Sequence, residues 1–388
     1  MSDPREEVRG PYATGGPNAA GGPYATGGPY ATGGPYATGG PVPDWTVRLI
    51  ERMPKAELHL HLDGSLRVDT AIEIARTRGV DAPTSWAGMT GVLVGPPRSR
   101  DQADLLRAFD LPIALMQDEA AIERIAAELV EDKAADNVRY MEIRWGPLLH
   151  VERGLPLAQG IAAVVSGVER AARDTGSTVR LICTALRSHD PDANADLAET
   201  AAPFVDRGLT GWDLAGPEAR FPDPTTNARA FDAARAGGLR ITLHAGEWGG
   251  AAQVRRALDM DPERIAHGSA AADDATLMAE LRDRGVCLDL CPTSNAQAAI
   301  VPTVAEHPIA RLHRAGNPVT LNTDDLTVSD LTLSEEYRNA IERIGLSLPE
   351  LWKIDRFALD VAFAEEPVLA RLRAEFDTWA AGIPELHE

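Results

Sequence analysis

The chain has 388 residues, enough for one large domain or two ordinary ones, and 44% of them are apolar, which is sufficient for a full hydrophobic core. The formal net charge of −20 would repel phosphate backbones and anionic lipids, so we expect neither a nucleic-acid nor a membrane partner. Three cysteines are too few for a disulfide framework, and neither a signal-peptide core nor a membrane-length apolar run is found. We therefore expect a soluble, cytoplasmic protein, whose oligomeric state the sequence leaves unknown.

A six-residue repeat, close to PYATGG, runs from Pro11 to the end of the first forty residues. Its glycine and proline content, with little to bury, is typical of a flexible segment. We expect residues 1–42 to be a disordered tail and residues 43–388 to form a single domain.

The remaining sequence alternates β-rich runs with helical patterns. Eight strands are expected, at residues 56–64, 139–145, 178–186, 209–215, 239–245, 264–267, 287–291 and 318–323. Eight such strands with intervening helices predict a (β/α)8 barrel of the TIM type. An open doubly wound sheet is the alternative, but neither a GxGxxG motif after the first strand nor a phosphate-binding P-loop is present.

Amphipathic periodicity predicts several of the helices. The stretch 118–137 places apolar residues on one face, and 157–176 and 334–345 follow similar patterns; the face comprises Ile122, Ile125, Ala126, Leu129 and Val130. The segment between the first two strands, about residues 65–138, is longer than one crossover helix needs. We expect a helical insertion there, which would act as a lid.

The first strand carries two histidines in the sequence ELHLHLDG. His59 and His61 are two residues apart, so both point to the same face of the strand. In a barrel strand that face is the interior, and the C-terminal end carries the active site. Two hydrogen-bonded core histidines are the ordinary alternative, but a shared divalent metal satisfies both imidazoles more readily.

Other predicted strands also end in candidate ligands. His244 ends the fifth strand and is followed by Glu247, His267 ends the sixth, and the paired carboxylates Asp324 and Asp325 follow the eighth. The other histidines lie in loops or helices, and we expect ordinary structural roles for them; they are His150, His189, His307, His313 and His387. Of these, only His189 follows a strand closely enough to be a candidate for a hydrogen bond to one of the metal-binding residues.

Six motifs together resemble the adenosine deaminase family, within the wider amidohydrolase barrels, and its bacterial members in particular. They are KAELHLHLDGSL, DLAGPE, HAGE, RIAHG, CPTSN and LNTDD, in the family's order. The resemblance spans about Pro43 to Phe376. It implies a zinc-dependent hydrolase that converts adenosine, and 2′-deoxyadenosine, to inosine and ammonia.

The resemblance also implies roles for individual residues. One zinc ion per chain would be bound by His59, His61, His244 and Asp324. Glu247 would be the proton shuttle, while His267 and Asp325 would orient the attacking hydroxide. The purine nucleoside would be contacted by His61, Asp63, Gly216 and Asp325, with Leu105 and Leu106 on an apolar gate helix.

This chemistry is sensible for these residue types. Zinc supplies hydroxide from water near neutral pH, and a carboxylic acid beside the ring can protonate N1 and then pass a proton to departing ammonia. Such an acid must be partly neutral, so we expect Glu247 in an apolar environment that raises its pKa. Three departures from the family pattern, Ala266, Trp248 and Leu326, leave the catalytic atoms in place but are expected to affect substrate preference.

Several rival functions stay open from the sequence. The substrate could instead be adenine, 6-aminodeoxyfutalosine or a modified adenine nucleoside. A two-metal amidohydrolase is disfavoured because none of the three lysines lies on the fourth strand. The spacing of Cys287 and Cys291 does not fit the zinc deaminases that act on flipped bases, so we interpret both as core residues. The alternative that is not an enzyme is an inactive zinc-containing protein that binds nucleosides.

Overall fold

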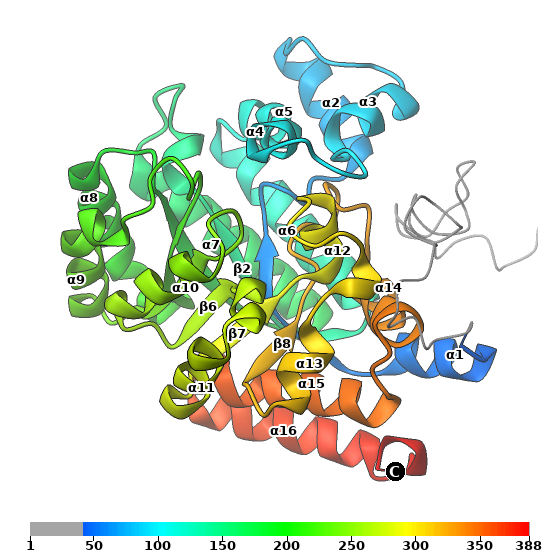
Figure 1. The fold of residues 1–388 in the computed structure, drawn as a ribbon. Coiled ribbons are helices and arrows are strands. Elements are labelled where there is room, and N and C mark those ends of the chain that lie inside the picture. The colour runs from blue at the N-terminus through cyan, green and yellow to red at the C-terminus, as the bar shows by residue number, and fades with distance from the viewer. Residues whose placement is uncertain (1–41, 388) are drawn as a thin grey trace, which may run out of the picture.

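The computed structural model describes residues 42–387, so the predicted tail lies outside the described residues except for Val42. Eight parallel strands form one sheet in chain order, surrounded by helices (Figure 1). The predicted (β/α)8 barrel is confirmed. The strands are β1 (Lys55–His61), β2 (Val138–Trp145), β3 (Thr178–Leu186), β4 (Leu209–Ala215), β5 (Arg240–Ala245), β6 (Arg264–His267), β7 (Cys287–Leu290) and β8 (Val319–Leu321).

The barrel closes between its first and last strands at a candidate site residue. Leu60 and Asp324 form a parallel bridge. The Asp324 amide donates to the His59 carbonyl at 3.1 Å, and the His61 amide donates to the Asp324 carbonyl at 2.7 Å. The seam that completes the barrel therefore fixes the backbone of three predicted metal ligands.

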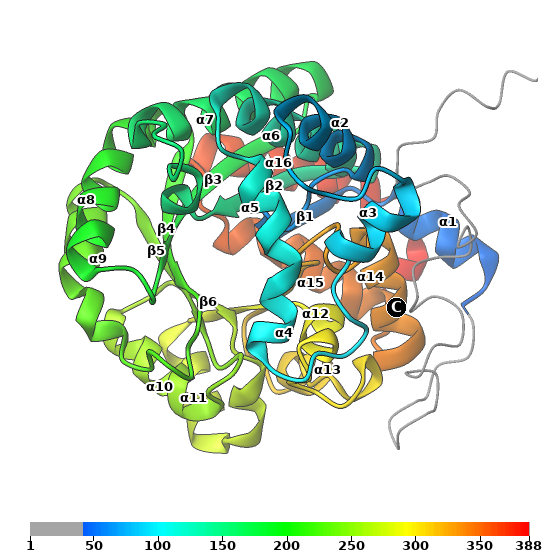
Figure 2. The ribbon, with the colours of Figure 1, turned by 90° about the horizontal axis from the view of Figure 1, so that it is seen from above.

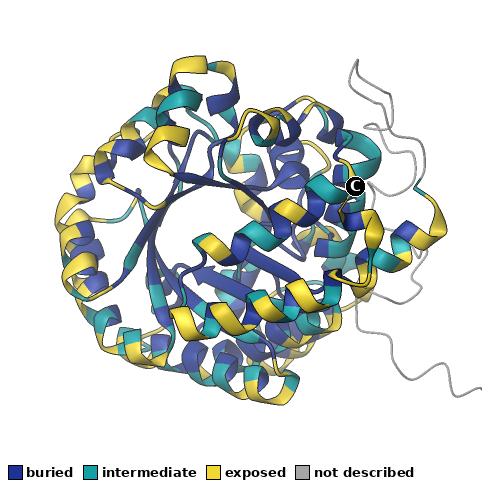
Figure 3. Cartoon of the chain, turned by 90° about the horizontal axis from the view of Figure 1, so that it is seen from below, coloured by how far each residue is buried: buried dark blue, intermediate teal, exposed yellow. Residues whose placement is uncertain are grey.

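The helices around the sheet bury one face each. In α6 (Glu119–Ala135) the buried residues include the whole predicted apolar face. Figure 3 shows this division, with buried strands inside and exposed outer helix faces. The other surrounding helices include α7 (Leu157–Thr175), α8 (Pro191–Ala201), α9 (Ala228–Ala236), α10 (Ala251–Ala257), α11 (Ala275–Arg284), α13 (Ile309–Arg314), α15 (Leu348–Val361) and α16 (Glu366–Ala380).

The predicted insertion between β1 and β2 is helical. Before α6 it contains α2 (Val68–Arg78), α3 (Trp86–Leu93), α4 (Gln102–Leu106) and α5 (Asp110–Leu115). Seen from above in Figure 2, α4 and α5 cross the centre of the ring of strands and helices. The insertion thus forms a lid over the C-terminal ends of the strands.

Contacts with later loops hold the lid in place. The Ser99 amide donates to the Gln297 carbonyl at 2.7 Å, beside α12 (Pro292–Gln297), and the Gly95 amide donates to the Val328 carbonyl at 2.9 Å. Under the lid lies a small apolar cluster separate from the main core, containing Leu105, Ala108, Phe109, Trp248, Ala298, Ile300 and Val328. The lid is therefore packed on its own small core.

Two remaining helices complete the described chain. They are α1 (Asp44–Arg52), which precedes the barrel, and α14 (Leu333–Asn339), which continues into a π-helical turn at Ala340–Ile344. Together α14 and this turn form the helix predicted at 334–345. Within residues 42–387, none of the helices has the length and apolar character needed to cross a bilayer.

Candidate active site

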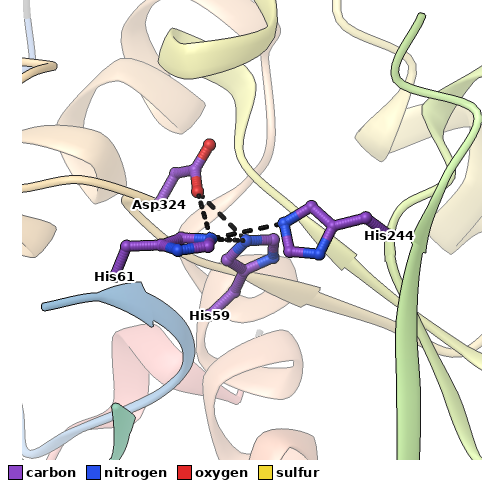
Figure 4. Close-up of side chains that lie close together, drawn as sticks. All are labelled: His59, His61, His244 and Asp324. Carbon is purple, nitrogen blue, oxygen red and sulfur yellow. Dashed lines mark hydrogen bonds and ion pairs between the residues drawn. The ribbon is translucent and has the colours of Figure 1, made fainter. Parts of the chain in front are cut away.

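Four predicted ligands from three separate parts of the barrel meet at its mouth. His59 and His61 lie on β1, His244 lies on β5, and Asp324 follows β8 (Figure 4). The Nε2 atom of His61 is 3.3 Å from the Nε2 atoms of both His59 and His244. Asp324 Oδ1 lies 3.0 Å from His59 Nε2 and 3.4 Å from His61 Nε2.

This arrangement fits a tetrahedral metal ion. Zinc bonds of about 2.0–2.1 Å place neighbouring ligand atoms about 3.3 Å apart, which matches the spacings between these donors. Neutral histidines are needed for this, and burial lowers the pKa of both His59 and His244. Three imidazole nitrogens and one carboxylate are a common zinc donor set. The residues present therefore fit one zinc ion.

Further side chains orient the ligands. His244 Nδ1 lies 3.0 Å from Asp213 Oδ2, so a proton on Nδ1 leaves the Nε2 lone pair facing the centre. Ser294 Oγ donates to Asp324 Oδ2 at 2.6 Å, which leaves Oδ1 toward the histidines. Although burial opposes ionisation, His244 and Arg144 hold the pKa of Asp213 well below its usual range.

A second group of possible ligands overlaps the first. His267, Cys291 and Asp324 each offer an atom within 4.8 Å of the others. Burial raises the pKa of the Cys291 thiol well above its ordinary value, and a metal ligand must be the thiolate. The set of three histidines and Asp324 is therefore the better candidate. Cys183 and Cys287 are buried free thiols like Cys291, as expected for core residues.

Glu247 lies beside this cluster on the loop that follows β5. Its side chain is 15% exposed, and its Oε1 is 3.8 Å from His267 Nε2. Burial, together with the charges of Asp324 and Glu218, raises the pKa of Glu247 well above its ordinary value. This shift favours the neutral form of the carboxyl group, which a proton donor requires.

Glu218 fixes the backbone of that loop. Its Oε1 accepts from the Gly246 amide at 2.7 Å, and its Oε2 accepts from the amides of Trp248 at 2.8 Å and Gly249 at 3.2 Å. These bonds lie on both sides of Glu247. The glutamate of the DLAGPE motif therefore determines where the proposed proton donor stands.

Two site residues have an unusual backbone. His267 has φ of 63° and Asp324 has φ of 72°, in the left-handed region that non-glycine residues rarely adopt. Such conformations cost about 1–3 kcal/mol and concentrate at functional sites. Their presence at the ends of β6 and β8 is consistent with a site that directs side chains into the mouth.

Asp325 is also buried at the mouth. Burial, and then the charges of Asp324 and Asp63, raise its pKa well above the ordinary value. Gly64 makes room for it, because a Cβ atom there would lie 1.7 Å from Asp325 Oδ1. The glycine of the HLDG motif is therefore required by a close approach to Asp325.

A group of polar side chains, formed by Asp63, His61 and His150, lies on the β1 side of the mouth. Asp63 Oδ1 is 3.7 Å from His61 Nδ1, and Asp63 Oδ2 is 4.0 Å from His150 Nε2. Although burial opposes ionisation, His61 and His150 lower the pKa of Asp63 below its ordinary value. Both ring nitrogens of His150 are buried without a well-formed hydrogen bond, and so is Asp63 Oδ1.

The remaining predicted substrate contacts lie under the lid or beside it. Gly216 has φ of 98°, and its carbonyl accepts from Gln102 of α4 at 3.4 Å. Leu105 is buried in the small apolar cluster, whereas the next residue, Leu106, is 39% exposed. Trp248, one of the departures from the family pattern, packs in the same cluster; the other two, Ala266 and Leu326, are buried.

Several residues at the site were not singled out from the sequence. They are Arg144, His150, Asp213, Glu218, Ser294, Asn295 and His307. Asp213 and Glu218 flank Gly216 in the sequence DLAGPE, so a strand-end carboxylate was a usable signal for Asp213. His150 and His307, expected to be ordinary structural histidines, lie near Asp63 and Asn295. His150 ends the 3-10 helix Pro147–His150 after β2, where no strand or helix periodicity marks it.

Comparison with known proteins agrees with this geometry. The profile described as adenosine deaminase matches residues 54–379. The chain belongs to the adenosine deaminase family. An adenosine deaminase of Vibrio atlanticus is 36% identical over 326 residues, which cover 82% of this chain and 96% of that protein. The protein is therefore a hydrolase of the adenosine deaminase type, which acts on C–N bonds, and the family is metal-dependent.

Solved structures that are similar to this chain are named for different substrates. A zinc-bound amidohydrolase from Burkholderia ambifaria superposes with a TM-score of 0.80 at 28% identity, covering 89% of this chain and 96% of that chain. An adenine deaminase from Arthrobacter aurescens gives 0.79 at 26% identity, covering 85% and 99%. The N6-methyl-AMP deaminase of Arabidopsis thaliana gives 0.76 at 31% identity, covering 86% and 98%. Proteins with this fold are thus named for a base and for a nucleotide.

Proposed function

We propose that the protein hydrolyses the 6-amino group of adenosine, and of 2′-deoxyadenosine, to give inosine or 2′-deoxyinosine and ammonia, with one zinc ion per chain. The observation that carries this proposal is the position of Glu247. A carboxyl group that is only 15% exposed and has a raised pKa lies next to a zinc-compatible group of ligands. This combination suits the addition of water to a ring carbon whose neighbouring nitrogen is protonated.

Each residue then has a distinct task. Zinc, held by His59, His61, His244 and Asp324, would supply hydroxide at neutral pH. Glu247 donates its proton to ring N1, which makes C6 electrophilic, and later delivers a proton to the leaving ammonia. His267 and Asp325 hydrogen-bond the attacking oxygen and direct it toward C6, and Gly216 offers its backbone to ring N3.

The group around Asp63 favours a nucleoside over a nucleotide. We propose that Asp63 and His61 bind the 5′-hydroxyl group of the sugar. A phosphate at that position would bring two or more oxygens toward an ionised carboxylate, and like charges close together cost several kcal/mol. The side chains that lower the pKa of Asp63 are the imidazoles of His61 and His150. Burial lowers the pKa of His150, so its neutral form, which would not attract a phosphate, is favoured.

Ammonia release from a substrate panel tests this function. The panel contains adenosine, 2′-deoxyadenosine, adenine, 6-aminodeoxyfutalosine, AMP and N6-methyl-AMP. We expect the highest kcat/KM for adenosine or 2′-deoxyadenosine. A higher value for adenine or for either nucleotide would overturn the proposed substrate.

The variant Asp63→Asn tests the role of the carboxylate. It keeps the size of the side chain but removes the charge, so the preference for adenosine over AMP should fall by at least about tenfold. Zinc content should be unchanged, because Asp63 is not a ligand in this scheme. An unchanged preference with normal zinc would show that another part of the pocket excludes the phosphate.

A further inference from the structure

A chain of hydrogen bonds leads from the backbone at the start of α13 to the catalytic histidine. The Ile309 amide donates to His307 Nδ1 at 3.3 Å. His307 Nε2 lies 3.1 Å from Asn295 Oδ1, and Asn295 Nδ2 lies 3.0 Å from His267 Nδ1. All three side chains are buried: Asn295 is fully inaccessible, and His267 and His307 are 1% and 3% exposed.

The donor and acceptor of every hydrogen bond in this series follow from the first one, which the Ile309 amide donates. A backbone amide can only donate, and the amide of Ile309 begins α13, where no acceptor in the same helix is available to it. His307 Nδ1 must therefore accept, and a neutral His307 carries its proton on Nε2. Burial lowers the pKa of His307 to about 3, which keeps the ring neutral.

The same logic continues through Asn295. Since His307 Nε2–H donates, the Asn295 oxygen must face His307 and its amide nitrogen must face His267. The reverse orientation of the amide would place two N–H groups against each other. His267 Nδ1 then accepts, so the single proton of a neutral His267 resides on Nε2.

The surroundings of His267 Nε2 agree with this assignment. This atom lies 3.8 Å from Asp324 Oδ2 and 3.8 Å from Glu247 Oε1. As a zinc ligand, Asp324 would be ionised. An N–H group is attracted to an ionised carboxylate, whereas a ring lone pair would be repelled by it.

We propose that His307 and Asn295 are positioning residues that hold His267 as the Nε2–H tautomer, so that His267 donates a hydrogen bond to the attacking oxygen and does not remove its proton. The second half of this proposal rests on the proposed deamination, and the tautomer itself does not. The proton that remains on the attacking oxygen must then go to a group other than His267. Glu247, after giving its first proton to N1, is a carboxylate that can accept this proton and pass it to the leaving ammonia.

The tautomer can be measured without any substrate. In protein labelled with ¹⁵N-histidine, long-range ¹H–¹⁵N correlation spectra distinguish protonated from unprotonated ring nitrogens, and the spectrum of His267→Gln identifies the signals of His267. We expect a protonated Nε2 and an unprotonated Nδ1 in the zinc-loaded wild-type protein. The opposite tautomer, or a ring protonated on both nitrogens, would overturn the proposal even if adenosine is turned over.

Two substitutions of His307 then test this series of hydrogen bonds. Gln can donate to Asn295 as His307 does, whereas Leu cannot, so His307→Gln should keep kcat within about threefold and His307→Leu should lower it by the ~10–100-fold typical of removing an outer-sphere partner. KM should change little, because His307 does not contact the substrate. His313→Leu, on the outer helix α13, is the matched control and should behave as wild type.

The outcomes separate this proposal from the proposed function. Equal loss of kcat in both His307 variants, with an unchanged His267 signal in each, would overturn the positioning role. If none of the panel substrates is deaminated, the proposed function fails, but the wild-type spectrum still decides the tautomer. If His307→Leu does not fold, the wild-type spectrum and His307→Gln carry the test.

Discussion

Two buried polar regions of the barrel follow opposite electrostatic rules. Below the mouth, acidic and basic side chains alternate in a charge ladder that comprises Glu142, Arg264, Asp289, Arg144 and Asp213. At the mouth, by contrast, the carboxyl groups of Asp324, Asp325 and Glu247 lie near one another. Within residues 42–387, no lysine or arginine forms an ion pair with any of these three.

The difference separates structural from functional polarity. In the ladder each charge faces an opposite one, which is how buried charges are normally tolerated. At the mouth the imbalance appears as raised pKa values for Asp325 and Glu247 and as three imidazole nitrogens that face one another. A divalent cation would balance this region, so the mouth is arranged for a ligand that the chain itself does not supply.

The largest effect is expected from removing a metal ligand at the mouth. His244→Ala should abolish zinc binding and turnover together, because three remaining donors leave the tetrahedral set incomplete. Asp213→Asn keeps the ligand but weakens its orientation, so it should cost only about 10–100-fold in metal affinity. Elemental analysis and ammonia release measure both. A wild-type protein with two zinc ions, or an active one with none, would contradict the proposed centre.

Glu247→Gln should be next in size. It keeps the shape of the side chain but cannot cycle a proton, so kcat should fall by about 10²–10⁴-fold with zinc retained. The wild-type rate should also fall as pH rises through the raised pKa of Glu247, because the proton donor is then lost. A variant within about tenfold of the wild-type rate would place the proton shuttle elsewhere.

Much of the fold could be predicted because strand and helix periodicities are local. β3, β4 and β6 match their predicted bounds, and the predicted apolar face of α6 is buried. The first strand was expected to reach Gly64 but ends at His61, and the last is shorter than expected. Both ends are set by the Leu60–Asp324 seam, which joins residues far apart in the chain and leaves no local pattern.

The candidate ligands could be predicted for a similar reason. His59, His61, His244 and Asp324 lie at strand ends, and a barrel brings strand ends together. The supporting residues could not be found this way. Asn295 and His307 belong to a short helix and a loop, and their connection to His267 depends on how those segments fold back onto β6.

The Arg264 end of the charge ladder, away from Asp213, should control stability and not chemistry. Arg264 is fully buried, contacts Glu142, donates to Asp289 at 3.0 Å and stacks 3.7 Å from the centre of the Phe363 ring. Arg264→Met removes the arginine partner of Glu142 and leaves Asp289 with the longer pair to Arg144, at 3.7 Å. Breaking a buried pair costs about 3–5 kcal/mol of unfolding free energy. Urea unfolding measures the loss, while zinc content and kcat of the folded variant should remain near wild type.

Arg240→Met is the matched control for that substitution. Arg240 also lies over the Phe363 ring, at 4.3 Å, and pairs with Glu263, but its side chain is 39% exposed. An exposed ion pair contributes about 1 kcal/mol or less, so this variant should lose much less stability. Equal losses for the two variants would mean that packing on Phe363, and not pairing within the ladder, is the main contribution.

The smallest effect is expected from deleting the PYATGG repeats. A chain that begins at Pro43 keeps α1 and every contact of the mouth and the ladder, and the repeats carry few apolar side chains that could contribute to a core. Melting temperature, zinc content and kcat should therefore equal those of the full chain.

The surface most sensitive to this truncation is the one around α1, where Trp45 is 47% exposed and shares a shallow pocket with Leu49 and Ile383. A clear fall in melting temperature on truncation, reversed when Trp45 is also replaced by a polar residue, would show that the repeats cover this surface.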